Sequence, residues 1–507
     1  MFMYRIITFY FSITLLLLLS LTLTACETQS GLPVLAMPGE QQDLLTADPA
    51  SSEDEIGLRS QATPIPSRPR YQPGELVEYV AQTGDTLPAL AARFNTSIDE
   101  IMEANPIIPT EVTTLPPGLP MQIPIYYLPL WGSPYQILPD SLFVNGPAQV
   151  NFDPTDFVAS HHGWLKEFRG FAAGRNQTGP ELVDWVALNY SISPRLLLAL
   201  LEYQSGGLSQ IEPSQEARLY PLGYQNTRYQ GMTQQMIWAA NTLNDTYYAY
   251  RTGELTSFQL RDGSLERPDP WQNAASVAIQ VYFSKILSPQ EYAQAISPSG
   301  FAQTYQSLFG DPWRDEVAHI PGSLQQPEMK LPFRIRTTWS FTGGPHTGWG
   351  TGKPWAALDF APPAVAGGCI PTDEFATAVA PGVIVRSEPA TVVLDLDGDG
   401  LENTGWVIFY YHVATEGRVP EGAVLDTGDP IGRPSCEGGR STGTHIHIAR
   451  KYNGEWVPAA GVLPFNLDGW IAQKGDAPYQ GTMTRNSRTV TASESSAPYS
   501  FISALER

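Results

Sequence analysis

Basic residues, cysteines and histidines are scarce in this chain. It has 30 lysines and arginines against 51 aspartates and glutamates in 507 residues, which gives a formal net charge of −21. A nucleic-acid-binding protein presents a basic face to phosphates, so this balance argues against nucleic acid as a partner. The length predicts roughly three or four domains, and 42% hydrophobic residues are enough for ordinary cores.

A long apolar run lies at the N-terminus, between Arg5 and Cys26. A positive charge, an apolar segment and small residues before a cut are typical of a secretory signal. Leu23-Thr24-Ala25-Cys26 resembles a bacterial lipobox, which implies removal of a signal peptide over residues 1–26 and lipidation of Cys26. The alternative is an uncleaved transmembrane anchor. Both interpretations place the rest of the chain outside the cytoplasm, and the lipobox predicts attachment to the membrane through Cys26.

Only three cysteines are present, so Cys369 and Cys436 remain if Cys26 is lipidated. Two cysteines in an exported chain predict a disulfide, and two buried free thiols are the alternative. Residues 27–73 are rich in Ser, Pro, Gln, Asp and Glu and poor in aromatic residues. This composition predicts a flexible tether rather than a packed core.

Residues 74–127 contain YVAQTGDTLPALAARF, IDEIMEANP and PGLPMQIP. Thr86 is placed to cap a helix in which Leu87, Leu90 and Phe94 recur at helical spacing, and a small βααβ unit is expected. The stretch resembles a LysM domain over its full length, which implies binding of glycans that contain N-acetylglucosamine. The resemblance places the groove in the loop after the first strand and the loop before the last, at Gly84, Asp85, Thr86, Leu87, Asn105, Pro106 and Ile107. A purely structural copy is the alternative.

Residues 146–322 have helical periodicity, and Ser193-Pro194 is a good helix start. The segment SPRLLLALLEYQSGG is similar to the active-site helix of lysozyme-like lytic transglycosylases. Where that family has its catalytic acid this chain has Gln204, which cannot supply a proton. Glu202 points to another side of the helix, and Glu181 and Glu216 have no assigned role. We expect an all-α, lysozyme-like domain that holds glycan without cleaving it; active lyase chemistry and a plain spacer are the alternatives.

Residues 328–472 form short apolar or alternating runs between Gly, Asp and Pro turns, which predicts a compact all-β domain. Residues 473–507 are polar and rich in Ser and Thr, and we expect them to form a flexible or loosely docked tail.

Four of the seven histidines lie in the predicted β domain. His445 and His447 form an H-x-H on a predicted strand, where a period of two puts both rings on one face. His412 ends another apolar strand, and Asp359 follows a glycine-rich approach. Catalytic zinc needs three protein ligands and one open position. The alternative is a set of hydrogen-bonded structural histidines.

The segments AVAPGVIV, FYYHVA, TGDPIG and STGTHIH, in this order, resemble the lysostaphin-type zinc peptidases that cut peptidoglycan cross-links. The resemblance implies that Asp359 and His447 bind zinc and that His412 and His445 flank the zinc-bound water. The remaining ligand would stand at position 355, where this chain has Trp355, and indole cannot coordinate zinc. We expect His346, nine residues earlier in GGPHTGWG, to take the vacant ligand position, with Trp355 as a wall of the site.

Asp395, Asp397 and Asp399 have the spacing of a calcium loop and precede Gly400. A full EF-hand loop needs an acid at its twelfth position, which is Trp406 here. An Asp/Gly hairpin turn is the more economical interpretation, and Ca²⁺ at these three aspartates is the alternative.

Together these features predict a multidomain α+β protein that is exported and anchored to the cell membrane by lipid. The expected activity is that of a zinc metalloendopeptidase that cuts the peptide cross-links of peptidoglycan and is targeted by the LysM domain. The alternative is a catalytically inactive peptidoglycan-binding scaffold, or an activator of other wall hydrolases. A third class, a glycan-cleaving enzyme, would act through the helical domain.

Overall fold

The computed structural model describes residues 68–504, except 127, 130, 365 and 366. The predicted signal peptide, Cys26 and most of the predicted tether lie outside the described residues. No helix in the described part of the chain is both long and apolar enough to cross a membrane. At the end of the predicted tether, Arg68 forms an ion pair with Asp269 at 3.0 Å and lies over the ring of Trp271.

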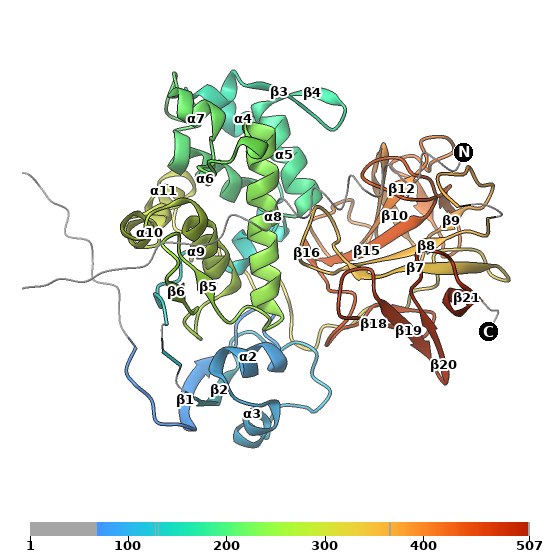
Figure 1. Ribbon diagram of the computed structural model, residues 1–507, viewed down its shortest axis with the longest axis horizontal. Coiled ribbons are helices and arrows are strands. Elements are labelled where there is room, and N and C mark those ends of the chain that lie inside the picture. Colours follow the sequence, from blue (N-terminus) through green and yellow to red (C-terminus); the bar gives the residue numbers. More distant parts are fainter. Residues whose placement is uncertain (1–67, 127, 130, 365–366, 505–507) are drawn as a thin grey trace, which may run out of the picture. The chain divides into compact units, whose positions relative to one another are not determined.

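The first folded region is the expected βααβ unit (Figure 1). Strand β1 (Glu75–Val80) pairs antiparallel with β2 (Pro120–Ile125), and α2 (Leu87–Phe94) and α3 (Ile98–Ala104) lie between them in sequence. Thr86 caps α2 by accepting a hydrogen bond from the Ala89 backbone N–H, as its side chain predicts. The apolar faces of both helices close a small core with the strands, which includes the fully buried side chains of Leu90, Phe94, Ile101, Leu115 and Ile123.

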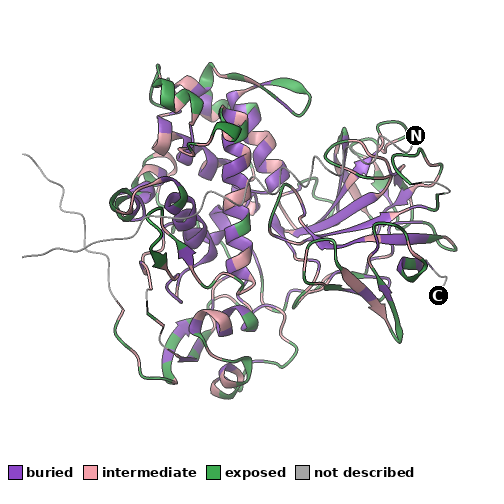
Figure 2. Cartoon of the chain, in the orientation of Figure 1, coloured by how far each residue is buried: buried purple, intermediate pink, exposed green. Residues whose placement is uncertain are grey.

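The middle region is mainly helical and is built around α8 (Met232–Arg251) and α9 (Ala274–Ile286). Almost every residue of α9 is buried (Figure 2). Its other helices are α4 (Pro154–Ala159), α5 (Gly179–Tyr190), α6 (Pro194–Ser205), α7 (Gln215–Leu219), α10 (Pro289–Ala295) and α11 (Phe301–Phe309). Ser193 caps α6 and Pro194 is its first residue, as predicted. The region is not purely helical, because β3 (Arg169–Ala172) pairs with β4 (Arg175–Thr178) and β5 (Phe258–Gln259) with β6 (Leu265–Glu266).

The C-terminal region contains a nine-stranded antiparallel sheet in the order β13-β10-β11-β12-β15-β8-β7-β21, with β16 paired to β15. These strands are β7 (Thr338–His346), β8 (Ala357–Ala361), β10 (Gly382–Glu388), β11 (Ala390–Asp395), β12 (Trp406–Val413), β13 (Val424–Leu425), β15 (Ile446–Tyr452), β16 (Glu455–Trp456) and β21 (Phe501–Ser503). A small pair joins β9 (Ala376–Thr377) to β14 (Pro430–Gly432). The three-part order of mixed small domain, helical region and β-rich domain confirms the predicted fold class.

The large sheet carries apolar side chains on both faces. Successive side chains of a strand point to opposite faces, so an uninterrupted apolar strand contributes to a core on each side. On β12, Ile408 and Tyr410 belong to a core formed within the β domain, whereas Val407 and Phe409 belong to the core of the helical region. Ala357 on β8, Ala449 on β15 and Trp456 on β16 also belong to the core of the helical region. One face of the sheet therefore packs against the helical region, and this is the face on which the candidate site lies.

The expectation of a flexible or loosely docked tail is wrong for residues 473–504, which contribute strands to two sheets. After β17 (Asn466–Leu467) and β18 (Trp470–Lys474), the chain forms β19 (Gly481–Arg485) and β20 (Arg488–Thr491), which complete a four-stranded sheet. Strand β21 then pairs with β7. The polar composition misled the prediction, because a hairpin with one buried face needs few apolar residues, here Met483 and Val490.

Candidate active site

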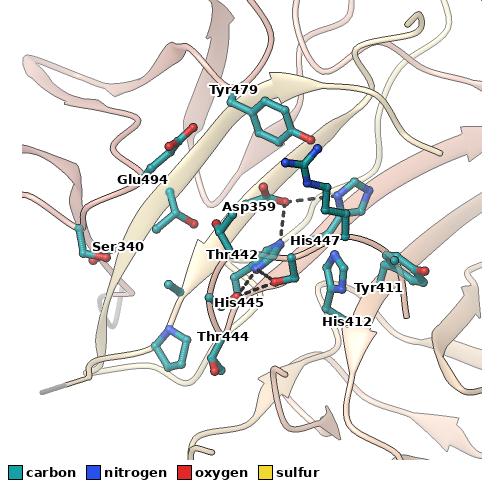
Figure 3. Close-up of a pocket in the computed structure, with 18 of the residues that line it drawn as sticks. Ser340, Asp359, Tyr411, His412, Thr442, Thr444, His445, His447, Tyr479 and Glu494 are labelled. Carbon is teal, nitrogen blue, oxygen red and sulfur yellow. Dashed lines mark hydrogen bonds and ion pairs between the residues drawn. The ribbon is translucent and has the colours of Figure 1, made fainter. Parts of the chain in front are cut away.

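Three potential metal ligands meet where β7, β8 and β15 run side by side. His447 on β15 lies directly opposite Asp359 on β8, and His346 is the last residue of β7. Nε2 of His346 lies 3.0 Å from Nδ1 of His447, and both atoms are 3.3 Å from Oδ1 of Asp359. All three side chains are buried (Figure 3 shows Asp359 and His447). The ring of residue 346 therefore reaches the site from the position where the sequence predicted a substitute ligand.

The hydrogen bonds of the two rings leave the inward-facing nitrogens unprotonated. Nδ1–H of His346 donates to the Gly344 carbonyl at 2.8 Å, and Nε2–H of His447 donates to the Gly348 carbonyl at 3.1 Å. Such outer bonds fix the tautomer and the orientation of a ligating imidazole. Oδ1 of Asp359 is buried without a hydrogen bond of good geometry. Two imidazole nitrogens and an unsatisfied carboxylate oxygen, within 4.8 Å of one another, form a set that fits a metal ion.

The electrostatics of Asp359 favour its charged form. Burial alone would raise the pKa of this carboxyl, but the nearby imidazoles of His346 and His445 outweigh burial and hold the pKa well below its usual value. A carboxylate that stays ionised is ready to bind a cation.

His412 and His445 lie beside this cluster with the same pattern of bonding. Nδ1–H of His412 donates to the Glu437 carbonyl at 2.8 Å, and Nδ1–H of His445 donates to the Gly443 carbonyl at 2.7 Å. Their ring centroids are 4.5 Å apart, and Nε2 of His445 is 3.8 Å from Oδ1 of Asp359. Both Nε2 atoms are thus left free to exchange protons with a bound molecule.

His412 has two further signs of a functional position. Its φ is +63°, a left-handed conformation that costs energy for a residue with a large side chain. Burial, followed by the nearby His445 and His447, lowers its pKa to about 3. The ring is therefore neutral near pH 7.

The five residues line one cavity of about 1710 Å³. The sequence missed several other residues of its wall. Tyr479 stacks on His346 with ring centroids 4.2 Å apart, and Glu494 lies on the same side (Figure 3). Trp185 and Tyr190 of α5 also line the cavity. In the sequence these residues were only aromatic or acidic side chains. They lay in stretches assigned to the helical domain or to the C-terminal tail, so nothing connected them with the site.

Trp355 does not wall the site. Its ring lies under the ammonium group of Lys353 at 3.9 Å, and it is absent from the described residues that line the cavity. The tryptophan at the wall is Trp349, which packs against Tyr411 at 4.8 Å. Five residues separate the two tryptophans, and their roles could not be distinguished from spacing.

Cys369 and Cys436 form a disulfide with Cα atoms 5.7 Å apart. Gly368 and Ile370, the neighbours of Cys369, line the cavity. The bond therefore links two loops at the rim of the site.

The predicted glycan-binding residues of the small domain are mostly buried. Asp85 is 1% exposed, pairs with Arg93 at 2.8 Å and accepts a hydrogen bond from Tyr79. Asn105 bonds the backbone of Ile101 and Gln122. Gly84 and Leu87 are also buried and Thr86 caps α2, while Pro106 and Ile107 are exposed. Most of these residues therefore shape the groove loops rather than present themselves to solvent.

The three glutamates of the helical region singled out in the sequence have structural contacts. Oε2 of Glu202 accepts from the backbone of Leu208 and Ser209, and Glu181 completes a capping box with Thr178. Glu216 contacts Gln225 on an exposed helix. These contacts give no sign of a glycan-cleaving acid.

The aspartate loop forms a compact turn. Asp395 accepts from the backbone N–H groups of Asp397 and Gly400, and Asp399 accepts from Leu401. The carboxylates of Asp395, Asp397 and Asp399 also lie close enough to share a cation. Burial raises the pKa of Asp395 to about 6, against the opposing effect of the hydrogen bond from the Gly400 N–H.

Comparisons with known proteins agree with this division of the chain. Residues 79–124 match the model of the LysM domain, and residues 136–323 match that of the LasA N-terminal domain. The latter match covers the helical region that we compared with lytic transglycosylases. Over 365 residues the chain is 28% identical to Protease LasA from Pseudomonas aeruginosa (strain UCBPP-PA14). The match covers 67% of this chain and 78% of that protein.

Two solved structures are also similar. The deep-sea M23 metalloprotease pseudoalterin is 25% identical, with a TM-score of 0.28, over 33% of this chain and 96% of its own. The antimicrobial peptidase lysostaphin from Staphylococcus simulans is 20% identical, with a TM-score of 0.18, over 32% of this chain and 66% of its own. By the sequence matches, the chain contains a region similar to the LysM domain, followed by a region similar to the LasA N-terminal domain, and 365 of its residues align with Protease LasA.

Proposed function

We propose that this protein is a zinc metalloendopeptidase that hydrolyses peptide cross-links of peptidoglycan. The observation that carries the proposal is the convergence of His346, Asp359 and His447 beside His412 and His445 in one open cavity. The alternative, an inactive scaffold or activator, would not need all five side chains in this arrangement.

Nε2 of His346, Oδ1 of Asp359 and Nδ1 of His447 would hold the metal ion. Two imidazoles and one carboxylate are a ligand set that suits zinc, whereas Ca²⁺ and Mg²⁺ prefer oxygen ligands. When bound, zinc polarises the scissile carbonyl and lowers the pKa of the attacking water.

The two neighbouring histidines would move the protons of the hydrolysis. As the water oxygen bonds to the carbonyl carbon, Nε2 of His445 or His412 takes a proton from that water. As the carbon–nitrogen bond breaks, the proton is passed to the leaving amine nitrogen. The second proton of the water ends on the same nitrogen, so the products are a carboxylate and an ammonium group, and both atoms and charge balance. The carbonyl bonds at Nδ1 keep each ring in the tautomer that this exchange needs.

The LysM domain would bring the peptidase to its substrate by binding peptidoglycan glycan. Binding of one polymer by two domains of one chain raises the local substrate concentration and offsets modest affinity in the catalytic cavity. The signal and lipobox features predict an extracytoplasmic protein held to the membrane through Cys26. A calcium ion at Asp395, Asp397 and Asp399 would be a separate, structural feature of the β domain.

The test combines metal analysis with product analysis on purified peptidoglycan. We expect the wild type to contain one equivalent of zinc and to release new amino groups. His346→Ala and His447→Ala should lose both zinc and activity. Trp355→Phe is the matched control, and it should keep both because its ring is outside the site.

Two results would contradict the proposal. A protein without zinc that still binds peptidoglycan would support the scaffold. Release of reducing ends or anhydro-sugars, with no new amino groups, would point to glycan cleavage.

A further inference from the structure

The groove loops of the LysM domain are covered by another part of the same chain. The covering segment, residues 319–324, connects the helical region to the β domain. The two groove loops are residues 81–86, after β1, and residues 105–119, before β2. The segment contacts Thr83 of the first loop and Thr113, Thr114 and Pro116 of the second, so it lies against both loops that the LysM resemblance assigns to the glycan groove.

The first loop is held by a reciprocal pair of hydrogen bonds. The Ile320 N–H donates to the hydroxyl of Thr83 at 2.9 Å, and this hydroxyl donates to the Ile320 carbonyl at 3.3 Å. Thr83, His319 and Ile320 are all buried. Arg251 of α8 covers the neighbouring Gly84, where an added Cβ would lie 2.5 Å from the guanidinium.

The second loop is held more extensively. The hydroxyl of Thr114 donates to the Pro321 carbonyl at 2.7 Å and accepts from the Leu324 N–H at 3.0 Å. The Ser323 N–H donates to the Thr114 carbonyl at 2.7 Å, and the Thr113 hydroxyl donates to the Leu324 carbonyl at 2.7 Å. Polar groups of both loops are therefore satisfied by peptide backbone.

Gly322 allows the closest approach. A Cβ at this position would lie 2.8 Å from Cα of Pro116, closer than real Cβ atoms come. The segment can therefore reach the loop only because residue 322 has no side chain.

The chemistry of the contacts resembles that of a glycan. The acetamido group of an N-acetylated sugar offers one N–H and one carbonyl, as a peptide unit does. A segment of the same chain competes at a high effective concentration, since its translational freedom is already lost. Binding of sugar would therefore have to replace bonds that the folded chain already makes.

We propose that residues 319–324 occupy the glycan groove of the LysM domain and that an N-acetylated glycan must displace them to bind. The inference rests on the proposed binding of peptidoglycan by this domain. The exposed Ile107, at 78% of its full accessibility, remains available as a first contact at the edge of the groove.

The segment also couples the groove to the β domain. Gln326, two residues beyond it, donates to the Asn466 carbonyl at 2.6 Å and accepts from Arg450. Displacement of the segment by glycan would thus disturb the contacts of Gln326 with Asn466 and Arg450, where the chain enters the β domain.

The experiment measures binding of a soluble N-acetylglucosamine hexamer to the full chain by calorimetry. Gly322→Val should push the segment away from Pro116 and tighten binding roughly tenfold or more, because the open state becomes the major state. Ser323→Pro is a second disrupting variant, since residue 323 has φ +51° and donates an N–H, and proline permits neither. Gln325→Val is the matched control, with the same new side chain at an exposed neighbouring position.

Hydrogen exchange of the Ile320, Ser323 and Leu324 amides follows the segment itself. The expected result is that hexamer binding to the wild type removes their protection. The proposal is overturned if the wild type binds as tightly as both disrupting variants and these amides stay protected. It also fails if the variants lose protection and still bind no hexamer, which would refute glycan binding by this groove while leaving the peptidase activity to be judged by its own products.

Discussion

At the scale of single residues, the position of the Asp359 carboxylate depends on the absence of a side chain at the neighbouring residue 343. Gly343 of β7 lies opposite Asp359 in the sheet register. An added Cβ at residue 343 would lie 2.4 Å from Oδ2 of Asp359. The carboxylate can therefore take its place only next to a glycine.

Gly343→Ala should displace the Asp359 carboxylate while the sheet stays folded. We expect zinc affinity and peptidase activity to fall by about 10- to 100-fold, the usual effect of disturbing the surroundings of a metal ligand. Zinc titration and amino-group release measure the two effects. Gly367→Ala is the control, because an added Cβ there meets no atom of the described residues within 4 Å. Equal zinc affinity in the two variants would contradict the assignment of Asp359 as a ligand.

At the scale of elements, the loop between β7 and β8 is fixed by a helix from another region. The Thr351 N–H donates to Asn241 at 2.7 Å and the Lys353 N–H donates to Asp245 at 2.9 Å, both on α8. The same loop provides the Gly348 carbonyl that orients His447. The helical region therefore helps to position His447, a proposed metal ligand, through this loop.

Asn241→Ala combined with Asp245→Ala should loosen this loop. We expect peptidase activity to fall by about tenfold, because the outer bond of His447 becomes less well placed. The measurement is the rate of amino-group release at saturating zinc, and circular dichroism checks that α8 persists. Gln234→Ala, an exposed change on the same helix, should have no effect. A double variant as active as the wild type would show that the loop holds its shape unaided.

The elements also show what the sequence could and could not predict. Alternation predicted that His445 and His447 face the same way, although His445 immediately precedes β15, and the helical spacing around Leu90 predicted the first helix of the βααβ unit. Both predictions depend only on neighbouring residues. Tyr479 and Trp349 could not be assigned, since their roles depend on contacts made only after distant strands pair. Strand β19 was missed because its partner strand and one buried methionine, rather than its composition, hold it in place.

At the scale of the whole molecule, a buried charge cluster connects the folded regions. Arg251 of α8 pairs with Glu455 of β16 at 2.9 Å and with Asp140 at 3.5 Å. His319 lies 2.8 Å from the same Glu455 oxygen, and Tyr247 donates to it at 3.0 Å. Arg251 also donates to the Thr83 carbonyl in the LysM domain. Removal of one partner would leave buried charge unpaired, which is costly.

This cluster predicts how stability depends on pH. Burial would raise the pKa of Glu455, but Arg251 and His319 outweigh burial and lower it to about 2. A carboxyl whose pKa is depressed by folding stabilises the protein above its unfolded pKa of about 4.5, and this contribution is lost as pH falls toward 2. Glu455→Gln removes the titration, so the difference in unfolding free energy between wild type and variant should shrink by about 2 kcal/mol between pH 7 and pH 3.

Urea unfolding of both proteins at the two pH values measures this difference. Comparison with the variant isolates Glu455 from Asp140, whose pKa is raised by burial and whose effect on stability has the opposite sign. A difference that stays constant from pH 7 to pH 3 would mean that Glu455 is not held as a buried carboxylate. The charge cluster would then not be what joins the LysM domain, the helical region and the peptidase domain.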